Sequence, residues 1–301
     1  MDSQRRLLLK RQEWWFSRTT FVFSLVAVMV SVGIVYALLS ETILFFRDVP
    51  LWEFLTDPIW SPVEGIGDRM HFGIRPLLVG TLLVTVGAMF IAIPLGLITA
   101  IFLSEYAPPT IAKILKPVLE MLAGIPSVVY GFFALTFITP LLQQLMPQTN
   151  IFNALSASIA MGFMILPLVT SFSQDALQVV PNNLRHAGYA LGLTQHEVSV
   201  GIVVPAARSG IVAACVLAVS RAIGETMIVA MAAGAFPNMS FNPLEPVMTL
   251  TGFIAMMASS DVAQGITSYH ALYAVGLLLF LFTLVMNILA QRFVKKSRKW
   301  L

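Results

Sequence analysis

Two ionisable residues, Arg221 and Glu225, lie four positions apart inside a long apolar stretch of this chain. Ionisable side chains are costly at the centre of a bilayer, so they usually mark a substrate pathway or a proton relay. The planar guanidinium of arginine can bind an oxyanion through two parallel hydrogen bonds. Glu225, one helical turn further on, could orient that guanidinium or reject an anion that has no proton to donate. The spacing therefore predicts an oxyanion site that includes Arg221, Glu225 and the adjacent Thr226.

An alternative is that the two charges only neutralise each other and hold helices together. Two apolar residues would achieve the same packing at a lower cost, because desolvating an ion pair is unfavourable. Arg221 also lies 13 residues after Arg208, which corresponds to about 20 Å along a helix. Arg208 can therefore reach the inner membrane interface, and Arg221 cannot. We favour contact with a substrate for Arg221 and Glu225.

A proline-containing sequence, Gly124-Ile125-Pro126-Ser127, interrupts another apolar stretch. Proline removes a backbone hydrogen bond and kinks a helix, and membranes tolerate this where the freed groups face protein or water. Ser127 could place a hydroxyl at such a point. Most kinks of this kind are only packing features, so the signal is weak on its own. We include Ser127 among the residues expected to contact a substrate.

The overall composition indicates a membrane protein. The chain has 301 residues, of which 57% are hydrophobic and 11% are charged, and its mean hydropathy is +0.84. An average soluble domain carries about 25% charged residues. Too little polar surface is available to cover a soluble core of this size, and the same figures exclude a disordered chain.

The sequence lacks the patterns of common catalytic and metal sites. The single cysteine, Cys215, excludes an internal disulfide and a site built from several cysteines. The four histidines are scattered, and no glycine is followed by lysine, so the P-loop motif for ATP does not occur. We therefore predict no catalytic residue, no metal site and no cofactor in this chain.

Six stretches are long and apolar enough to cross a bilayer, for which a helix needs about 20 residues. The first is too long for a signal peptide and is expected to remain uncleaved. The third is interrupted by Pro126 and ends at Pro140, and the fifth contains Arg221 and Glu225. The expected spans are residues 19–46, 77–103, 115–142, 151–172, 201–235 and 271–293.

The distribution of charge predicts the orientation of these spans. Residues 1–18 contain five Lys or Arg, and residues 292–301 contain another five, so both ends are expected in the cytoplasm. The connection at 47–75 has three basic and five acidic residues, and that at 236–270 has two acidic and no basic ones. Both connections are expected outside. The terminal basic residues are expected to bind lipid headgroups rather than nucleic acid.

The loop between the fourth and fifth spans is expected to form a helical elbow on the cytoplasmic side. Pro181 suits the first turn of a helix, and Gly192 suits the left-handed position that ends one. Thr194 and Glu197 fit a capping box that opens a second helix. An interfacial helix lying on the membrane explains the local pattern equally well. The first helix is expected to face solvent and to present small residues that allow close approach by another surface: Ala187, Gly188 and Ala190.

The spacing of this loop resembles a motif of importer-type ABC permeases: Glu-Ala-Ala, three residues, Gly, nine residues, Ile-x-Leu-Pro. The spacing is complete, and three positions differ in residue type. Histidine stands in the place of glutamate, glycine in that of the second alanine, and valine in that of leucine. In the family this elbow docks on a cytoplasmic ATPase subunit. The resemblance therefore implies a coupling role for His186, Ala187, Gly188, Gly192 and Pro205.

Two further motifs together resemble the permease of phosphate-specific ABC transporters, more closely the PstC-type subunit than the PstA-type. They are Ile-Pro-Ser-Val-Val-Tyr-Gly at 125–131 and Arg-Ala-Ile-Gly-Glu-Thr at 221–226. Ser-Glu-Tyr at 104–106 fits the same pattern. The resemblance covers about residues 77–293.

This resemblance implies an all-α integral membrane protein with six transmembrane helices, the MetI-like fold of type I ABC importers, and both termini in the cytoplasm. The five-helix core contains the elbow. The expected organisation is a basic tail (1–18), a first transmembrane helix (19–46), an external connection (47–76), the permease core (77–293) with its elbow at 181–205, and a second basic tail (294–301).

The resemblance also implies import of inorganic phosphate across the cytoplasmic membrane of a prokaryote, by a multi-pass transport subunit that is not an enzyme. The expected partners are a second, PstA-type permease, a PstB-type ATPase dimer that binds ATP and Mg²⁺, and an external PstS-type phosphate-binding protein. No nucleic acid is expected among them.

Two other functions stay open on the sequence alone. A permease for sulfate or molybdate would keep the same architecture. Both of these anions are fully ionised at neutral pH, so Glu225 beside Arg221 mildly disfavours them. An ion-coupled secondary transporter predicts two matching halves with broken helices in corresponding positions. The halves do not match here, since the elbow and the Arg–Glu pair each occur once.

Overall fold

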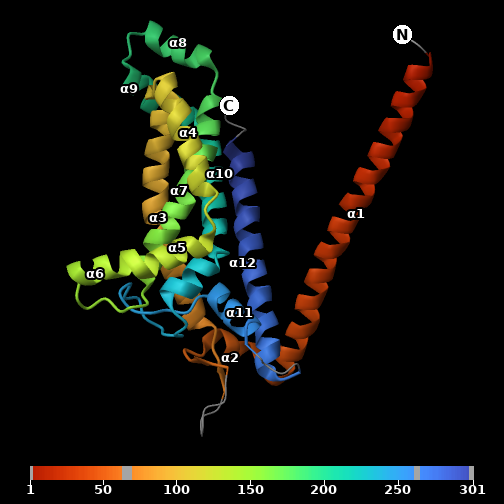
Figure 1. Cartoon of the computed structure of the whole chain (residues 1–301), viewed down its shortest axis with the longest axis vertical. Helices are drawn as coiled ribbons and strands as arrows, with labels where there is room; N and C mark the ends of the chain where they lie inside the picture. The colour runs from red at the N-terminus through yellow and green to blue at the C-terminus, as the bar shows by residue number, and fades with distance from the viewer. Residues whose placement is uncertain (1–2, 63–69, 261–264, 298–301) are drawn as a thin grey trace.

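The computed structural model of the chain describes residues 3–62, 70–260 and 265–297. Within these ranges, six helices are long and apolar enough to cross a membrane, which confirms the number of spans expected from the sequence. Three of them are the single helices α1 (Ser3–Asp48), α7 (Ala154–Gln178) and α12 (Thr267–Ser297), shown in Figure 1. The other three join shorter elements and cover Arg75–Tyr106, Ser127–Leu145 and Gln195–Ile223.

Helices α3 (Arg75–Ile101) and α7 lie against each other over most of their length. Small residues allow this approach, as is usual between helices in membranes. A Cβ atom at Gly87 would lie only 2.6 Å from the Ser158 hydroxyl. Hydroxyls also bond across the interface, from Ser158 to the carbonyl of Val84 and from Thr170 to that of Gly96, both at 3.2 Å. The contacts follow the same order along both helices, so α3 and α7 run parallel.

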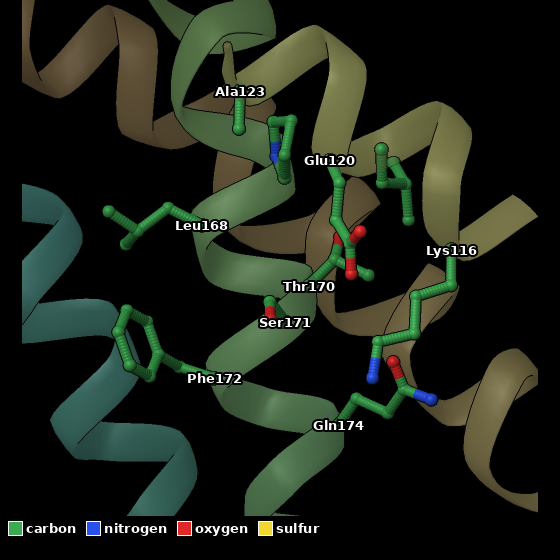
Figure 2. A pocket seen from close by; sticks show the side chains of 10 residues that line it. Lys116, Glu120, Ala123, Leu168, Thr170, Ser171, Phe172 and Gln174 are labelled. Carbon is green, nitrogen blue, oxygen red and sulfur yellow. The ribbon is translucent and has the colours of Figure 1, made fainter.

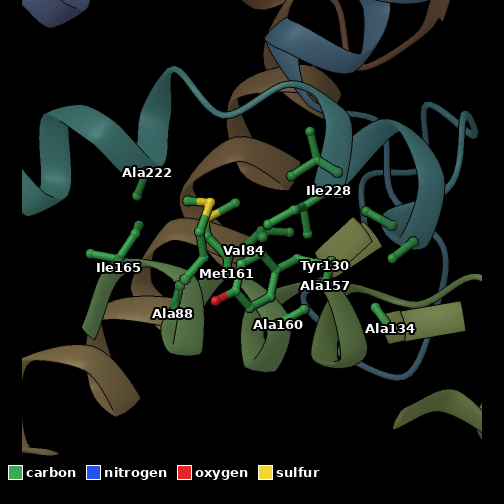
Figure 3. Packing of buried hydrophobic residues seen from close by; sticks show 14 of the residues in the cluster. Val84, Ala88, Tyr130, Ala134, Ala157, Ala160, Met161, Ile165, Ala222 and Ile228 are labelled. Carbon is green, nitrogen blue, oxygen red and sulfur yellow. The ribbon is translucent and has the colours of Figure 1, made fainter. Parts of the chain in front are cut away.

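A hydrophobic core in which alanine is the commonest residue joins α3 and α7 to α5 (Ser127–Phe133) and α10 (Val204–Ile223). Figure 3 shows Val84, Ala88 and Met161 at its centre, with the Tyr130 ring reaching in from α5. Ala222 and Ile228 also belong to this core. They flank Glu225, so the core directly supports the position of the predicted oxyanion site.

Helix α1 differs from the rest of the bundle because its apolar span is not buried against the chain. Figure 1 shows it diverging from α12 and meeting it near one end only. There, Glu41 Oε2 lies 2.8 Å from Nδ1 of His270, and the Thr267 hydroxyl donates to Asp48 at 3.1 Å. Most of the helix is therefore available to lipid or to another protein.

The third predicted span is interrupted at Pro126 as expected, but its bounds differ. The residues before the break form a separate amphipathic helix, α4 (Pro109–Ala123), with no buried residue. After the break, α5 passes through a π-helical turn, Ala134–Ile138, into α6 (Thr139–Leu145). The span therefore continues beyond Pro140, where it was expected to end. Pro140 closely follows the π-helical turn, where the regular i→i−4 pattern of backbone hydrogen bonds is already interrupted.

The connections at the other end of the bundle contain structure that the sequence did not reveal. The first has a short helix, α2 (Leu51–Thr56), and an antiparallel pair, β1 (Trp60–Ser61) and β2 (His71–Phe72). The second has α11 (Leu250–Ala258). Aromatic rings of the two connections pack edge to face with one another and with Phe45 of α1. These rings belong to Phe54, Trp60, Phe72 and Phe253.

The start of α1, the end of α12 and the elbow helix α8 (Asn182–Ala190) lie toward one end of the molecule, whereas α2 and α11 lie at the other (Figure 1). This arrangement agrees with the even number of spans. Which end faces the cytoplasm stays a prediction from charge. Residues 298–301 of the predicted tail 294–301 and residues 63–69 of the connection 47–76 lie outside the described residues.

Candidate functional site

The fifth predicted span, 201–235, is broken at the proposed site rather than continuous. Helix α10 ends at Ile223, and the Gly224 N–H donates to the Ser220 carbonyl at 3.4 Å. The helical path resumes after Glu225 and ends with the π-helical turn Val229–Ala233. Glycine is a poor helix former, and an acidic side chain can compete for backbone N–H groups and so open a new helix. Gly224 and Glu225 together therefore explain the break.

The Glu225 carboxylate caps the segment that follows the break. Its side chain is only 3% exposed, and Oε1 accepts hydrogen bonds from the N–H groups of Met227 (3.1 Å) and Ile228 (3.5 Å). A carboxylate at a helix N-terminus satisfies free donors and interacts favourably with the helix dipole. Glu225 therefore has a structural partner on one oxygen, which the sequence pattern did not reveal.

Arg221 stands on the opposite side of the break. Its Nη1 lies 3.8 Å from Glu225 Oε2, so the predicted pair is brought together, but at a distance longer than a hydrogen bond. The arginine side chain is 53% exposed. Within the described part of the chain, no other hydrogen bond or ion pair engages its guanidinium. Most of its donors are therefore free to bind a further group.

Threonines from α3 and α11 hold the break from the other side. The Thr251 hydroxyl donates to the Glu225 carbonyl at 2.7 Å and lies 3.2 Å from the Thr249 hydroxyl. Thr249 in turn caps α11. The Thr81 hydroxyl of α3 accepts from the Leu250 N–H at 3.0 Å. All three threonines are buried. Sequence reasoning missed them, because isolated threonines in apolar stretches carry no spacing signal.

The remaining predicted substrate residues lie near the break without joining the pair. Thr226 is half-buried, and its hydroxyl donates to the Gly224 carbonyl at 3.3 Å. Ser127, also half-buried, begins α5. A Cβ at Gly131, one turn later, would lie 3.2 Å from the Met227 carbonyl, so α5 packs on the segment after the break. No interaction among residues 3–62, 70–260 and 265–297 links Ser127 to Arg221.

The local structure of the elbow is as predicted. Helix α8 is followed by Gly192 with φ of +81°, the left-handed conformation that favours glycine. Thr194 and Glu197 then form a complete capping box at the start of α9 (Gln195–Val198). The helix continues into α10, where Pro205 lies in the first turn. His186 and Ala187 are exposed on α8.

One residue of the elbow faces the other way. Gly188 was expected on the solvent-facing side with Ala187 and Ala190, but it is buried. A Cβ at this position would lie 2.8 Å from Ile202 and 2.9 Å from Val198. Its small size therefore lets α8 pack on the following helix instead of admitting an external surface. An ion pair that the sequence analysis did not anticipate, Arg185–Glu105, also holds the elbow.

A separate cavity of about 250 Å³ lies between α4 and α7 (Figure 2). Its polar side chains are those of Lys116, Glu120, Thr170, Ser171 and Gln174. Its walls are otherwise largely apolar, with Leu168 and Phe172 on α7. None of its lining residues belongs to the Arg221 site, so the cavity is distinct from the break.

Comparison with known proteins adds sequence relatives. The family described as "Binding-protein-dependent transport system inner membrane component" matches residues 92–299. The probable ABC transporter permease protein YqgH of Bacillus subtilis is 37% identical over 80% of this chain and 78% of its own. The phosphate transport system permease protein PstC of Haemophilus influenzae is 30% identical over 94% and 93%. The PstC protein of Mesorhizobium japonicum is 32% identical over 80% and 77%.

Solved structures confirm the predicted fold class. An inward-facing MetNI methionine ABC transporter has a TM-score of 0.58 at 17% identity, covering 74% of this chain and 95% of that one. A bacterial ABC transporter involved in the import of alginate, an acidic polysaccharide, has a TM-score of 0.56 at 14% identity, covering 88% and 96%. At these identities the likeness establishes the fold alone.

Proposed function

Because this chain belongs to the family of binding-protein-dependent transport system inner membrane components, we propose that it is the permease subunit of an ATP-driven importer of inorganic phosphate. Membership makes the chain a multi-pass ABC importer permease. The cargo is the proposed part. It is supported by relatives that bear the name of phosphate permeases and by the arginine at the helix break.

The observation that carries the proposal is the free guanidinium of Arg221 at the helix break, well inside the apolar stretch 201–235. An exposed cation at this depth is costly unless an anion or water meets it. Phosphate offers oxygens in the geometry that a guanidinium binds through two hydrogen bonds.

Arg221 lies on the surface of this chain, so the chain supplies one wall of the proposed pathway. A second permease subunit would supply the other and would exclude lipid from the guanidinium. We propose a PstA-type partner in this place. The largely unburied helix α1 provides further apolar surface for lipid or for that subunit.

The geometry at Glu225 favours one of its two suggested roles. Oε1 is held by two backbone N–H groups, and Oε2 is the oxygen closest to Arg221. We propose that Glu225 fixes the break and orients the guanidinium. Discrimination of protonated phosphate needs a free acceptor. It would fall to Oε2 alone, because backbone N–H groups already engage Oε1.

The energy for import has to come from another subunit. Moving each negative charge into a cell costs about 2.3 kcal/mol per 100 mV of membrane potential, and this chain has no P-loop. We propose that a PstB-type ATPase dimer binds ATP and Mg²⁺ and docks on α8, where His186 and Ala187 are exposed. A PstS-type protein would deliver phosphate at the opposite end of the bundle.

Substitution of Arg221 tests the proposal. In the reconstituted transporter, Arg221→Ala should lower phosphate uptake by about 10- to 100-fold, since it removes a charge-assisted contact worth about 1.5–3 kcal/mol. Arg221→Lys keeps the charge without the planar pair of donors and should retain part of the uptake. Arg208→Ala, which removes an arginine from the same helix, is the matched control. Wild-type uptake in Arg221→Ala would refute the assigned role.

The nature of the cargo needs its own measurement. Uptake of labelled phosphate should resist an excess of sulfate and molybdate. Strong competition by either anion would favour the alternative permease for another oxyanion. An ion-coupled transporter working alone is disfavoured by the family, and uptake by this chain without any ATPase would be its signature.

A further inference from the structure

A tight ion pair connects the elbow to the end of α3. Arg185, on α8, donates from Nη2 to Glu105 Oε1 at 2.8 Å and from Nε to Oε2 at 3.1 Å. The two residues lie 80 positions apart, and their side chains are only 15% and 6% exposed. Glu105 belongs to the π-helical turn, Phe102–Tyr106, that ends the second span. This parallel arrangement of two bonds is the most directional form of an Arg–carboxylate pair.

The same guanidinium also binds the end of α7. Nη2 donates to the Leu177 carbonyl at 2.9 Å, and Nη1 donates to the Val180 carbonyl at 2.6 Å. Carbonyls at a helix C-terminus lack partners within the helix, so a cation is favoured there. One side chain therefore joins three elements: α3, α7 and α8. The hydrogen bonds to Glu105 raise the pKa of Arg185, so the guanidinium stays charged.

Glu105 is held as firmly as its partner. The Ser104 hydroxyl donates to its Oε1 at 2.9 Å, and the Gln195 side chain donates to its backbone carbonyl at 2.5 Å. Gln195 begins α9, so both helices of the elbow contact the same residue of the π-helical turn that continues α3. Apart from Gly188, no residue of α8 is buried, so the side chains of this helix contribute little to a core. Polar contacts at Glu105 are therefore the principal attachment of α8 to α3.

Helix α3 connects this attachment to the helix break. From Glu105 it runs through the bundle against α7 to Thr81, which accepts a hydrogen bond from Leu250. The next residue, Thr251, donates to the Glu225 carbonyl. A continuous series of packed and hydrogen-bonded elements thus extends from the elbow to the site of Arg221. Such continuity is required for mechanical coupling but does not by itself establish it.

We propose that Arg185 and Glu105 are positioning residues that transmit movement of the elbow to α3 and α7. This inference rests on the proposed function, because it assumes that an ATPase moves α8. Without the pair, α8 could follow the ATPase while α3 and α7 stay in place. ATP would then be hydrolysed without the corresponding movement of cargo.

The test uses the complete transporter, with its second permease, ATPase and binding protein, reconstituted in liposomes. Glu105→Gln combined with Arg185→Met removes both charges at similar volume, so no unpaired buried charge remains to unfold the chain. We expect assembly and ATP hydrolysis to persist, while phosphate imported per ATP falls about tenfold, within the usual range of coupling between sites. Lys113→Ala, which removes an exposed cation from α4, is the matched control. An unchanged ratio in the double variant would overturn the proposal.

A double-substitution cycle separates coupling from stability. Arg185→Ala and Glu105→Ala should each lower the amount of phosphate imported per ATP. The combined variant should import no less per ATP than the more impaired single variant, since the two residues act as a unit. Independent, multiplying losses would contradict a shared role. A fall in complex yield with an unchanged ratio would show a purely structural pair and would also overturn the proposal.

A distance measurement does not depend on the cargo. Spin labels at Tyr106 and Asn183, in a Cys215→Ser background, report the separation of α3 from α8. We expect one narrow distance in the nucleotide-free and vanadate-trapped states, and a broadened or shifted distance on trapping in Glu105→Gln/Arg185→Met. Identical distances in both proteins would refute the transmission role. A wild-type complex that moves no phosphate would refute the proposed cargo and leave this readout valid.

Discussion

Two arginine–glutamate pairs in the described part of this chain share their chemistry and differ in geometry. At the helix break, Arg221 and Glu225 are 3.8 Å apart, and the arginine side chain is 53% exposed. At the elbow, Arg185 and Glu105 are 2.8 Å apart, and the arginine side chain is 15% exposed. The first guanidinium retains donors for another partner, whereas the second has used its donors within the chain.

The contrast teaches how to separate a binding arginine from a structural one. A saturated guanidinium has nothing left to offer a substrate, so Arg185 can only hold elements together. Arg221 is loosely paired with a carboxylate that backbone N–H groups hold in place. Its guanidinium is therefore oriented and still has free donors. If burial alone were used to choose the substrate-binding pair, Arg185–Glu105 would be chosen, because its arginine is the more buried one.

Loss of the arginine should have the largest effect at the elbow. Arg185→Ala leaves Glu105 buried without a charged partner and should lower the free energy of unfolding by about 3–5 kcal/mol. Arg221→Ala removes an exposed and loosely paired cation and should cost at most about 1 kcal/mol. Unfolding of the purified chain in detergent measures both. Equal losses would remove the distinction between the pairs.

Packing around the elbow gives the next largest effect. Gly188→Val would press on Val198 and Ile202 and should cost about 1–3 kcal/mol, as overpacked sites do. Ala187→Val, on the exposed side of the same helix, is the matched control and should leave stability unchanged. Thermal unfolding distinguishes the two variants. Similar stability of both would show that Gly188 does not close the elbow.

Two substitutions separate the two functions of the Glu225 carboxylate, capping the helix and orienting Arg221. Glu225→Ala removes the cap and should cost about 0.5–2 kcal/mol. Glu225→Gln keeps an oxygen for the N–H groups of Met227 and Ile228, so most of that stability should return. Phosphate uptake should fall in both variants, because neither side chain retains a charge to orient Arg221. Recovery of uptake in Glu225→Gln would sharpen the comparison toward a purely structural cap.

The left-handed residue of the elbow, Gly192, offers a test of similar size. Gly192→Val places a branched side chain at φ of +81° and should cost about 1–2 kcal/mol locally. The resulting change in the angle between α8 and α9 should uncouple ATP hydrolysis from transport. The ratio of ATP hydrolysed to phosphate imported is the measurement. A normal ratio would show that docking does not depend on this angle.

The smallest expected effect concerns the threonine bridge. Thr251→Val removes the hydrogen bond to the Glu225 carbonyl and should cost about 0.5–1.5 kcal/mol. Thr251→Ser keeps the hydroxyl and should behave like the wild type. A Thr251→Val protein with full uptake and full stability would show that α11 does not support the break.

Patterns that depend on neighbouring positions were predictable. The capping box of Thr194 and Glu197 and the left-handed Gly192 follow from local backbone chemistry, and both are confirmed. Six apolar spans follow from the length of a helix across a bilayer. The orientation of Gly188 was predicted wrongly, because sequence spacing does not show which face of a short helix another element covers.

The sequence by itself determined the apolar spans, the elbow and the presence of an arginine within an apolar stretch. These features arise from hydropathy, caps and glycine geometry, which act over a few residues. Only the tertiary structure decided which arginine is saturated, because Glu105 lies 80 positions from Arg185. It also decided that the fifth span breaks at Gly224, where Glu225 takes the N–H groups of the next turn and Thr251 binds its carbonyl. Such contacts depend on how separate helices pack, and no local pattern specifies them.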